Sequence, residues 1–510
     1  MSKTLIISLL TIVHILYCCN GFHKKKTESP AEKSSQFVVG VDHLDYLKIV
    51  TNYADVMISK GQDIYGQKHS PLFASALKRS TMKIGPAESF ESIKGVRKND
   101  RTIGGANPLG DIGLYHILYT LSDITGNEMY SGEADKSIAY FFNNCQSPAT
   151  GLMAWGEHLY WDFEKEAVGY GKVNQDYHES GVWPFWDDSY RLAPEACWRF
   201  VIGEWDHQIA DKETGHFSRH ARWSEHGPYK GFEFPRYAGQ MIERWADAYR
   251  RKENLDRLRR EELLEAITVI FRRMEENVKM SKVGLLPAGT ADKGDHNKVV
   301  WLKSNLELAR CLEIAAPLFK NDLGKRMKQF ALKQDMDFLN APHKLDSAGG
   351  GFAVTLHADT GLPRVRSMNQ PYTSSWGSGY GYGPHTRVAN ICYLRYQKLN
   401  SEYPEMADNY KNLMLAAAEQ YLMSSPDTTQ LLKPDVFASA IELMLNSFEL
   451  TGDKRFLKRA IYFGEFGIGL FLDDEAPLPK ATNKHDHYET MTGGPKFMNA
   501  LLKIHLVMKR

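Results

Sequence analysis

Two segments far apart in the chain repeat one local pattern, and this repeat constrains the fold more than any other feature. Residues 121–130 read LSDITGNEMY, and residues 448–456 read FELTGDKRF. In both, a Thr-Gly pair ends an apolar helical stretch, and an Asn or Asp precedes the next helix, as expected of a glycine stop followed by a cap. Repeated helical hairpins in a chain with few alternating apolar runs predict an all-α fold, an (α/α) toroid of about six to seven hairpins.

The apolar periodicity agrees with helical hairpins from about Asp42 onward. Residues 435–450 place Val436, Leu443 and Phe448 on one face, and Pro434 precedes them as a helix-start signal. Residues 111–121 are apolar almost all round, as expected of a helix buried on two sides. We also expect helices over residues 261–275, 304–319 and 410–422.

Two segments interrupt the helical rhythm. Residues 349–382 contain GGGF, TGLP and WGSGYGY, and a shorter insertion covers residues 287–298. Glycine at this density is unfavourable in helix interiors, so we expect Gly-rich loops or short strands over a cleft. No linker divides the remaining chain, and residues 41–510 are predicted to form a single (α/α) barrel domain.

The beginning of the chain is typical of an export signal. A basic start at Lys3 is followed by an apolar run over residues 5–17, too short to span a bilayer permanently, and by Cys18 and Cys19. We expect a signal peptide over residues 1–21 and a polar tether over residues 22–40. A cysteine directly after the apolar run also resembles a bacterial lipoprotein signal, which would add a lipid anchor. The expected location is the periplasm, the exterior or an anchored position at the cell envelope.

The cysteines and the charge balance exclude several classes of protein. After the signal, the cysteines are widely spaced and none forms a Cys-x-x-Cys pair, which excludes thiolate metal sites and a disulfide scaffold. Buried free thiols are the expected state, with one disulfide as the alternative. Lys and Arg number 63 against 62 Asp and Glu, a net charge of +1, so no chain-wide field favours nucleic acid.

Histidines and carboxylates concentrate between residues 155 and 236. Residues 155–162 read WGEHLYWD, residues 176–179 read DYHE, and residues 215–220 read GHFSRH. Imidazoles and a carboxylate from separate segments can hold a divalent metal, and this donor set suits Mn²⁺, Zn²⁺ or Ni²⁺ more than Ca²⁺. The spacing alone is also compatible with core or surface histidines, because the chain contains 18 of them.

These three segments resemble, in order, the Gly-x-His-x-x-Trp-Asp, His-Glu and Arg-His segments of the pectate lyases of polysaccharide lyase family 2. Residues 63–73, 122–130 and 194–200 resemble other segments of the same family. The resemblance covers roughly residues 55–225 and implies an (α/α) toroid of about seven hairpins. It also implies an exported lyase that cleaves a uronic-acid-containing polysaccharide by metal-assisted β-elimination.

The resemblance assigns roles to four residues. His158, Glu179 and His220 match the positions that hold the catalytic metal in that family, and Arg219 matches its proton-abstracting arginine. The chain departs from the family pattern at Glu157, which stands where the family has a second Gly.

Further departures are Ser180, Gly181 and Ala221. The segment over residues 484–494 has no counterpart in the family pattern. These differences predict a distant relative that acts on a different polysaccharide.

The chemistry of elimination explains why such groups are needed. The proton at C5 of a uronate is α to a carboxylate, and a metal cation with an arginine on that carboxylate would stabilise the developing enolate. A free guanidinium is essentially always protonated. Either a lowered pKa makes Arg219 the base, or Arg219 neutralises charge while Tyr177, His178 or His216 takes the proton. The resemblance favours Arg219, with Tyr177 and His178 in reserve.

Aromatic, basic and imidazole side chains supply the substrate-binding candidates for an acidic polysaccharide or oligosaccharide. Aromatic residues make up 12% of the chain and can stack on sugar rings, although core packing uses them equally well. The tryptophan candidates are Trp155, Trp161, Trp183, Trp186 and Trp376. Arg191 and Arg236 could pair with uronate carboxylates, with structural salt bridges as the alternative. His385 and Arg387 are expected near the cleft, and His485 and His487 form a second metal or substrate site in one interpretation and a helix cap in the other.

Two other functions fit the same fold. A glycoside hydrolase or sugar epimerase would use acids or histidines in the same cleft, with carboxylates drawn from Asp162, Asp187, Asp188 and Glu204. A non-catalytic glycan-binding lipoprotein would bind without turnover. Helical toroids host all three functions, so the fold alone does not separate them.

Overall fold

The computed structural model describes residues 44–171, 176–179, 181–229, 233–251, 257–291, 293–345, 350–365, 371–376 and 383–510. Within this part of the chain, Asp45–Arg510 forms one compact unit. The predicted export signal and tether, residues 1–40, lie outside the described residues. None of the helices in the described ranges is long and apolar enough to cross a membrane.

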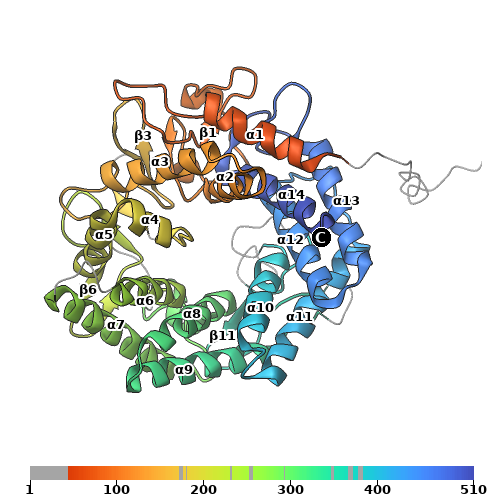
Figure 1. The fold of residues 1–510 in the computed structure, drawn as a ribbon. Helices are drawn as coiled ribbons and strands as arrows, with labels where there is room; N and C mark the ends of the chain where they lie inside the picture. The colour runs from red at the N-terminus through yellow and green to blue at the C-terminus, as the bar shows by residue number, and fades with distance from the viewer. Residues whose placement is uncertain are drawn as a thin grey trace, which may run out of the picture. The chain divides into compact units, whose positions relative to one another are not determined.

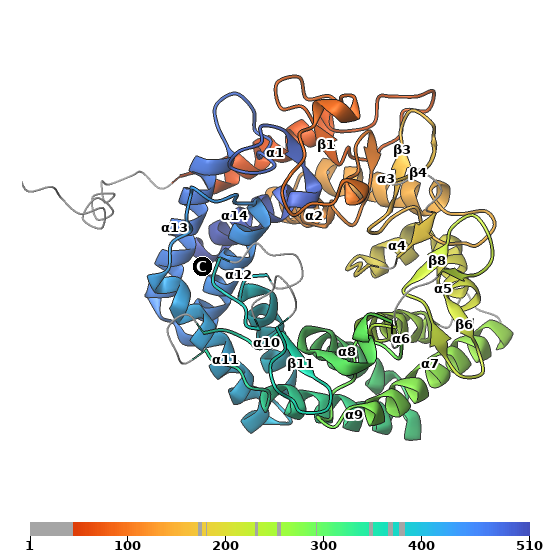
Figure 2. The same cartoon turned by 180° about the vertical axis from the view of Figure 1, so that it is seen from behind.

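Within residues 45–510, the helices follow one another around a ring (Figures 1 and 2). The outer helices are α1 (Tyr46–Lys60), α3 (Met129–Asn144), α5 (Pro194–His207), α7 (Arg257–Asn277), α9 (Asp322–Leu339), α11 (Pro404–Met423) and α13 (Lys454–Phe471). The inner helices are α2 (Ile112–Thr125), α4 (Trp186–Leu192), α6 (Pro235–Arg250), α8 (Leu302–Ala315), α10 (Thr386–Leu399), α12 (Pro434–Thr451) and α14 (Gly494–Met508). The predicted all-α toroid is therefore confirmed.

The helix boundaries follow from the sequence signals. Gly126 and Gly452, the two glycines of the repeated pattern, end α2 and α12 with φ values of 70° and 67°. Prolines occupy the first turn of α5, α6, α11 and α12, where the missing N–H costs no helical hydrogen bond. Helices α2 and α12 are thus bounded largely as the sequence predicts.

The ring is closed by contact between the first and last helices of the unit. α14 packs against α1, α2 and α12. A Cβ atom on Gly113 in α2 would lie 2.4 Å from the carbonyl oxygen of Pro495 in α14, so only glycine permits this approach. The strand β1 (Ala76–Leu77) pairs with β12 (Tyr488–Glu489), which fixes the early and late parts of the chain to each other.

The remaining strands are short and lie in the connections between helices. They are β2 (Gly105–Ala106), β3 (Leu159–Asp162) and β4 (Ala167–Tyr170) in one antiparallel sheet; β5 (Tyr177–His178), β8 (His220–Arg222) and β9 (Pro228–Tyr229) in a second; and the pairs β6 (Ile209–Asp211) with β7 (His216–Phe217) and β10 (Val299–Trp301) with β11 (Thr355–His357). β11 belongs to the glycine-rich segment for which short strands were predicted, and parts of that segment lie outside the described residues.

The core of the unit is apolar and contains the cysteines. Cys145, Cys197, Cys311 and Cys392 are buried free thiols, as expected, and the alternative of a disulfide among them is wrong. Burial raises the pKa of each of these thiols, so they have little thiolate character.

Candidate metal centre and cleft

Two antiparallel sheets bring the three predicted metal ligands together. His158 immediately precedes β3, Glu179 follows β5, and His220 begins β8. β5 pairs with β8 in the register His178↔Ala221, so Glu179 and His220 lie at the same end of this ladder. The approach of the first segment depends on Gly156, whose φ is +104° and whose added Cβ would lie 2.4 Å from the Glu179 carbonyl oxygen.

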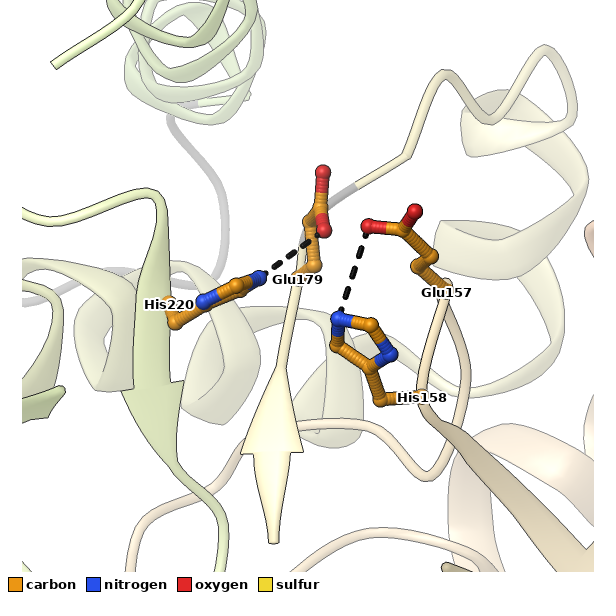
Figure 3. A group of neighbouring side chains, drawn as sticks. All are labelled: Glu157, His158, Glu179 and His220. Carbon is orange, nitrogen blue, oxygen red and sulfur yellow. Dashed lines mark hydrogen bonds and ion pairs between the residues drawn. The ribbon is translucent and has the colours of Figure 1, made fainter. Parts of the chain in front are cut away.

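The predicted ligands form a cluster with one additional carboxylate (Figure 3). One ligand atom from each of Glu157, His158, Glu179 and His220 lies within 4.8 Å of the others. His220 Nε2 lies 3.1 Å from Glu179 Oε2, and His158 Nε2 lies 3.4 Å from Glu157 Oε2. The two imidazole rings lie edge to face, with their centroids 5.1 Å apart and an interplanar angle of 64°. The cluster has two nitrogen and two carboxylate donors, and three of its members were predicted from the sequence.

Burial keeps both imidazoles of the cluster neutral at physiological pH. Burial, followed by the charge of His220, lowers the pKa of His158 to about 4. Burial and the nearby Arg219 and Arg97 lower the pKa of His220 to about 3. A metal requires the neutral imidazole, so no proton has to be displaced from either ring before an ion binds near pH 7.

Burial and neighbouring arginines have opposite effects on the pKa of the Glu179 carboxyl group. Its side chain is buried, and this burial raises the pKa of the carboxyl group. The positive charges of Arg219, Arg236 and Arg97 act in the opposite direction. A divalent ion would add another positive charge and favour the carboxylate form that binds it.

Arg219 lies at the edge of the cluster and faces both carboxylates. One of its terminal nitrogens is 3.7 Å from Glu157 Oε2 and 3.8 Å from Glu179 Oε2. Its guanidinium carbon lies 5.5 Å from the centre of the Phe234 ring, and its buried Nε has no hydrogen-bond partner among the described residues. Its backbone carbonyl accepts a hydrogen bond from Gln208. Arg219 is thus positioned beside the cluster with donors available to a ligand.

The donor set and its spacing fit a transition-metal ion. Two ligands that bind one ion at roughly 2.0–2.2 Å lie about 3.0–3.5 Å apart, which matches the 3.1 and 3.4 Å separations of the two His–Glu pairs. Imidazole with carboxylate favours Mn²⁺, Zn²⁺ or Ni²⁺, whereas Ca²⁺ prefers oxygen alone. His158 Nδ1 lies 3.6 Å from Asp100 Oδ1, which is too far for a hydrogen bond, so this carboxylate is near the histidine without bonding to it.

A cleft of about 350 Å³ opens beside the cluster. Its walls come from four regions of the chain, and three of them are Gly156, Glu157, Glu179 and Gly181 near the cluster; Tyr237 and Gln240 on α6; and Glu489, Thr490, Met491 and Lys496 near the carboxyl end. Ser75, Thr102, Asn107, Leu109 and Gly110 complete the lining. A volume at the lower end of the usual ligand-site range of roughly 300–1,000 Å³ is sufficient for a small ligand or part of a longer chain.

The two reserve bases differ in their positions. Tyr177 is half-buried and stacks on His220, with ring centroids 5.6 Å apart and an interplanar angle of 18°. His178 is completely buried, its Nε2 accepts a hydrogen bond from Trp155, and burial lowers its pKa to about 3. The prediction of His178 as a base is corrected, because successive strand residues point to opposite faces and this one points into the core.

Several predicted sugar-stacking tryptophans belong to the core. Trp155 is completely buried among Phe141, Phe142 and Phe200, and the prediction that it contacts sugar is therefore wrong. Trp183 is also buried and donates a hydrogen bond to Ser189.

The other three tryptophans predicted to stack on sugar are partly exposed. Trp161 lies on β3 opposite Val168, and Trp186 packs against Phe200. Trp376 donates a hydrogen bond to Ser424 and packs on Phe437.

The arginine candidates also divide into two groups. Arg236, in the first turn of α6, lies over the rings of Phe234 and Tyr237. Its positive charge lowers the pKa of the Glu179 carboxyl group, so it is near the cluster. Arg191 forms an exposed salt bridge with Asp135, in agreement with the structural alternative. Arg387 lies 3.6 Å from Asp435.

The remaining histidine candidates are outside the cluster. His385 is buried, with one ring nitrogen bonded to Thr373 and the other to Gln420, so its predicted contact with substrate is wrong. His216 pairs with Glu233 at 2.6 Å.

His485 and His487 do not form a three-ligand group with neighbouring carboxylates in the described part of the chain. His485 bonds to Thr482, and His487 bonds to Glu489 beside Arg101. The described residues therefore do not support the interpretation of His485 and His487 as a second metal site. His487 instead lies next to a residue of the cleft wall.

The carboxylates considered for a hydrolase do not form a pair in the cleft. Glu204 is completely buried in a bidentate salt bridge with Arg244. Asp162 accepts a salt bridge from Lys165, Asp188 from Arg191, and the exposed Asp187 from Arg251. None of them lines the cleft described above.

Three residues near the cluster were not identified from the sequence as functional. Glu157 contributes a carboxylate, although the sequence presented it only as a departure from the family glycine. Arg97 pairs with Glu157 and with Asp100, which in turn faces His158. The adjacency of Glu157 to His158 was the available signal, whereas nothing local in the sequence marks Arg97 and Asp100.

Comparison with known proteins supports the resemblance found in the motifs. Residues 88–251 match a family model described as periplasmic pectate lyase. This segment contains all four cluster residues and Arg219. It begins later than the expected start near residue 55, so residues 63–73 lie outside the match, and it extends beyond residue 225 to the end of α6.

The solved structures that match most of this chain have low sequence identity to it. D-Mannose isomerase is 10% identical, with 91% of this chain and 97% of that chain covered and a TM-score of 0.44. Cellobiose 2-epimerase from Bacillus thermoamylovorans is 8% identical, with coverages of 91% and 99% and a TM-score of 0.46. An unsaturated glucuronyl hydrolase from a Bacillus species is 12% identical, with coverages of 90% and 96% and a TM-score of 0.42. The match to the family model confirms the motif resemblance for residues 88–251, which are similar to periplasmic pectate lyases. Pectate lyases are carbohydrate-active enzymes.

Proposed function

We propose that this protein is an exported polysaccharide lyase that cleaves a uronic-acid-containing polysaccharide by metal-assisted β-elimination. The observation that carries the proposal is the cluster of two neutral imidazoles and two carboxylates with Arg219 beside it, inside the segment similar to pectate lyases. A periplasmic family and an export-like amino-terminal sequence support the location at the cell envelope.

In this proposal, His158, Glu179, His220 and Glu157 hold the divalent metal, and Mn²⁺, Zn²⁺ or Ni²⁺ suits them better than Ca²⁺. When bound, the ion would act as a Lewis acid that stabilises negative charge on the substrate carboxylate. The protein contributes the fixed positions of the four side chains. Asp100 lies 3.6 Å from His158 Nδ1, and Asn107 holds the preceding loop by donating to the Gly156 carbonyl at 2.7 Å.

The reaction removes the C5 proton and breaks the bond between C4 and the glycosidic oxygen. The C5–H electron pair forms the C4=C5 double bond, and the departing oxygen keeps the electrons of the broken C4–O bond and takes a proton from the protonated base or from water. Arg219 faces the place where a carboxylate would meet the cluster, so its donors stabilise the charge that develops as the proton leaves. The proton has two alternative acceptors: by resemblance Arg219, which must then react as the neutral guanidine, or, if Arg219 stays charged as a donor, Tyr177, which stacks on His220.

The proposal is tested by absorbance of the 4,5-unsaturated uronate product. Purified protein with Mn²⁺ would be incubated with pectate, glucuronan, rhamnogalacturonan and ulvan. We expect absorbance to rise with at least one polymer and to be lost in His158→Ala and Arg219→Ala. His226→Ala is the matched control, because this histidine is exposed and outside the cluster.

Each result has a distinct meaning. New reducing ends without unsaturated product would overturn the lyase assignment and favour a hydrolase. Tight binding without any cleavage would favour the glycan-binding alternative. Full activity in Arg219→Ala with normal folding would remove this residue from the mechanism and leave Tyr177 as the base.

A further inference from the structure

One wall of the cleft lies outside the segment similar to pectate lyases. Glu489, Thr490, Met491 and Lys496 line the same cleft as Glu157 and Glu179. The pectate-lyase match ends at residue 251, so this wall is supplied by the carboxyl-terminal part of the chain. Any ligand that fills the cleft beside the metal cluster would therefore also meet this wall.

The wall is firmly anchored. Arg101 donates to Glu489 through Nε at 2.9 Å and through a terminal nitrogen at 2.6 Å, and both side chains are buried. Glu489 also belongs to β12, which pairs with β1. His487 and Arg101 lower the pKa of the Glu489 carboxyl group. The one carboxylate of the wall is thus neutralised within the protein, and it does not repel an anionic ligand strongly.

Lys496 is the cation that the wall presents to the cleft. It lies in the first turn of α14 and is exposed. Among the described residues, no hydrogen-bond or ion-pair partner is found for its ammonium group. By contrast, Lys503 on the same helix pairs with Glu442. Lys496 is therefore available to an anion that enters the cleft.

A second lysine lies where α12 meets the start of α14. Lys433 directly precedes α12, and a Cβ atom on Gly493 would lie 2.4 Å from Asp435 Cβ, which shows how closely the two helix starts approach. The Lys433 side chain is half-buried, and its ammonium has no hydrogen-bond or ion-pair partner in the described ranges. A half-buried ammonium without a partner is unfavourable, because burial removes hydration that no protein group replaces.

Lys433 lies beside the wall and is not one of the residues that line the cleft. Asp435, two residues later in the chain, approaches Gly493, which follows the wall residues Thr490 and Met491. Burial and the positive charge of Arg387 lower the pKa of Lys433, whereas Asp435 and Glu489 oppose this shift. An anion beside Lys433 would supply the missing partner.

We propose that Lys496 and Lys433 form an anionic-sugar subsite that binds uronate carboxylates outside the reacting sugar. This inference rests on the proposed function, because it takes the ligand to be a polyuronate that extends from the metal cluster along the carboxyl-terminal wall. The two lysines bind the chain and set its preference for charged over esterified sugars. They do not take part in bond breaking, which occurs at the cluster.

The test uses the full chain with Mn²⁺ and the variants Lys496→Gln and Lys433→Gln, with Lys503→Gln as the control on the same helix. Binding of polygalacturonate, glucuronan, rhamnogalacturonan and ulvan would be measured by calorimetry, and KM and kcat with whichever polymer is cleaved. Loss of one charge-assisted hydrogen bond should raise Kd and KM about tenfold in each cleft variant. We expect kcat to change less than twofold, and the preference for polygalacturonate over its methyl ester to fall by the same factor as KM rises. Lys503→Gln should behave as the unmodified chain.

The outcomes separate this inference from the proposed function. Unchanged Kd and KM in both cleft variants, with normal cleavage, would overturn the subsite and leave the lyase assignment intact. Weakened binding in the variants without unsaturated product from any chain would retain the subsite and overturn the lyase assignment. If none of polygalacturonate, glucuronan, rhamnogalacturonan and ulvan binds the unmodified chain, both are wrong. Thermal melting of each variant, expected within 2 °C of the unmodified chain because both lysines lack protein partners, excludes misfolding as the cause.

Discussion

Glu157 provides the sharpest test of the metal cluster, because the resemblance alone would not assign it a ligand role. Its carboxylate lies with the other three ligand atoms inside 4.8 Å, and Arg97 is its partner. Glu157→Gln removes the charge and keeps the size of the side chain. Glu157→Gly restores the residue expected from the family pattern.

The structure sets a lower limit for the effect of Glu157→Gln. An ion enclosed by the cluster is no more than 4.8 Å from the Glu157 oxygen. At that distance, one negative charge stabilises a divalent cation by about 1.7 kcal/mol even at the dielectric constant of bulk water, ~80. This energy corresponds to a roughly twentyfold change in Kd. The partly buried site has a lower effective dielectric constant, and the freed charge of Arg97 adds repulsion, so the measured loss should be larger.

The assay is calorimetric titration of Mn²⁺ into metal-stripped protein. Glu164→Gln is the matched control, because this carboxylate is exposed in the turn between β3 and β4 and lies outside the cluster. We expect its Kd to remain within twofold of the unmodified value. A Kd for Glu157→Gln within twofold of the unmodified protein would show that Glu157 is not a metal ligand, and so would an equal loss of affinity in Glu164→Gln.

Three further predictions concern stability and catalysis. Burial lowers the pKa of His385 to about 4, below its usual value of 6.5. As the pH falls, the unfolded chain therefore takes up the proton before the folded chain does. The contribution of the neutral His385 to stability is fully present above pH 6.5 and is lost as the pH decreases toward 4. Protonation of this histidine should lower the free energy of unfolding by about 2 kcal/mol at pH 5 relative to pH 7.5. In urea unfolding, the free energy of unfolding of His385→Gln should therefore fall by about 2 kcal/mol less between these two pH values than that of the unmodified chain, and an equal fall in both proteins would contradict the prediction. Arg101→Met should lower the free energy of unfolding by about 3–5 kcal/mol, because Glu489 would remain buried without its partner, and an additional Glu489→Gln should recover part of the loss in the same denaturant assay; no recovery would disprove the buried-pair explanation. Arg219→Lys should reduce kcat about 100-fold while Mn²⁺ affinity changes less than threefold, because lysine keeps the charge but not the planar donors; a parallel loss of metal binding would show that Arg219 supports the cluster instead.

The fold was largely predictable because its signals are local. The Thr-Gly stops at Gly126 and Gly452 depend only on the few residues around them, and both glycines have the expected left-handed conformation. The all-round apolar composition of residues 111–121 likewise predicted an inner helix, and α2 is one. Such features specify helices and their burial without knowledge of the rest of the chain.

The candidate site was predictable only in part, because its geometry depends on long-range contacts. His158, Glu179 and His220 were found through their sequence motifs and lie together as expected. Trp155 and His178 have the same residue types as substrate-binding groups, but strand alternation and packing turn them into the core.

The wall of the cleft illustrates the same limit of local patterns. Glu489 lines the cleft because Arg101, far away in the sequence, holds it there. No local signal in residues 484–494 indicates that contact, and only the closed ring brings the two ends of the unit together.

Metal dependence of unsaturated-product formation is the most direct test of metal-assisted elimination by this protein. The full chain would be stripped with a chelator, and the absorbance of 4,5-unsaturated uronate would be followed on the cleaved polymer before and after Mn²⁺ is added. We expect the absorbance increase to be lost when the metal is removed, to return when Mn²⁺ is added, and not to return in His220→Ala. Undiminished formation of unsaturated product by the stripped protein would contradict metal-assisted elimination.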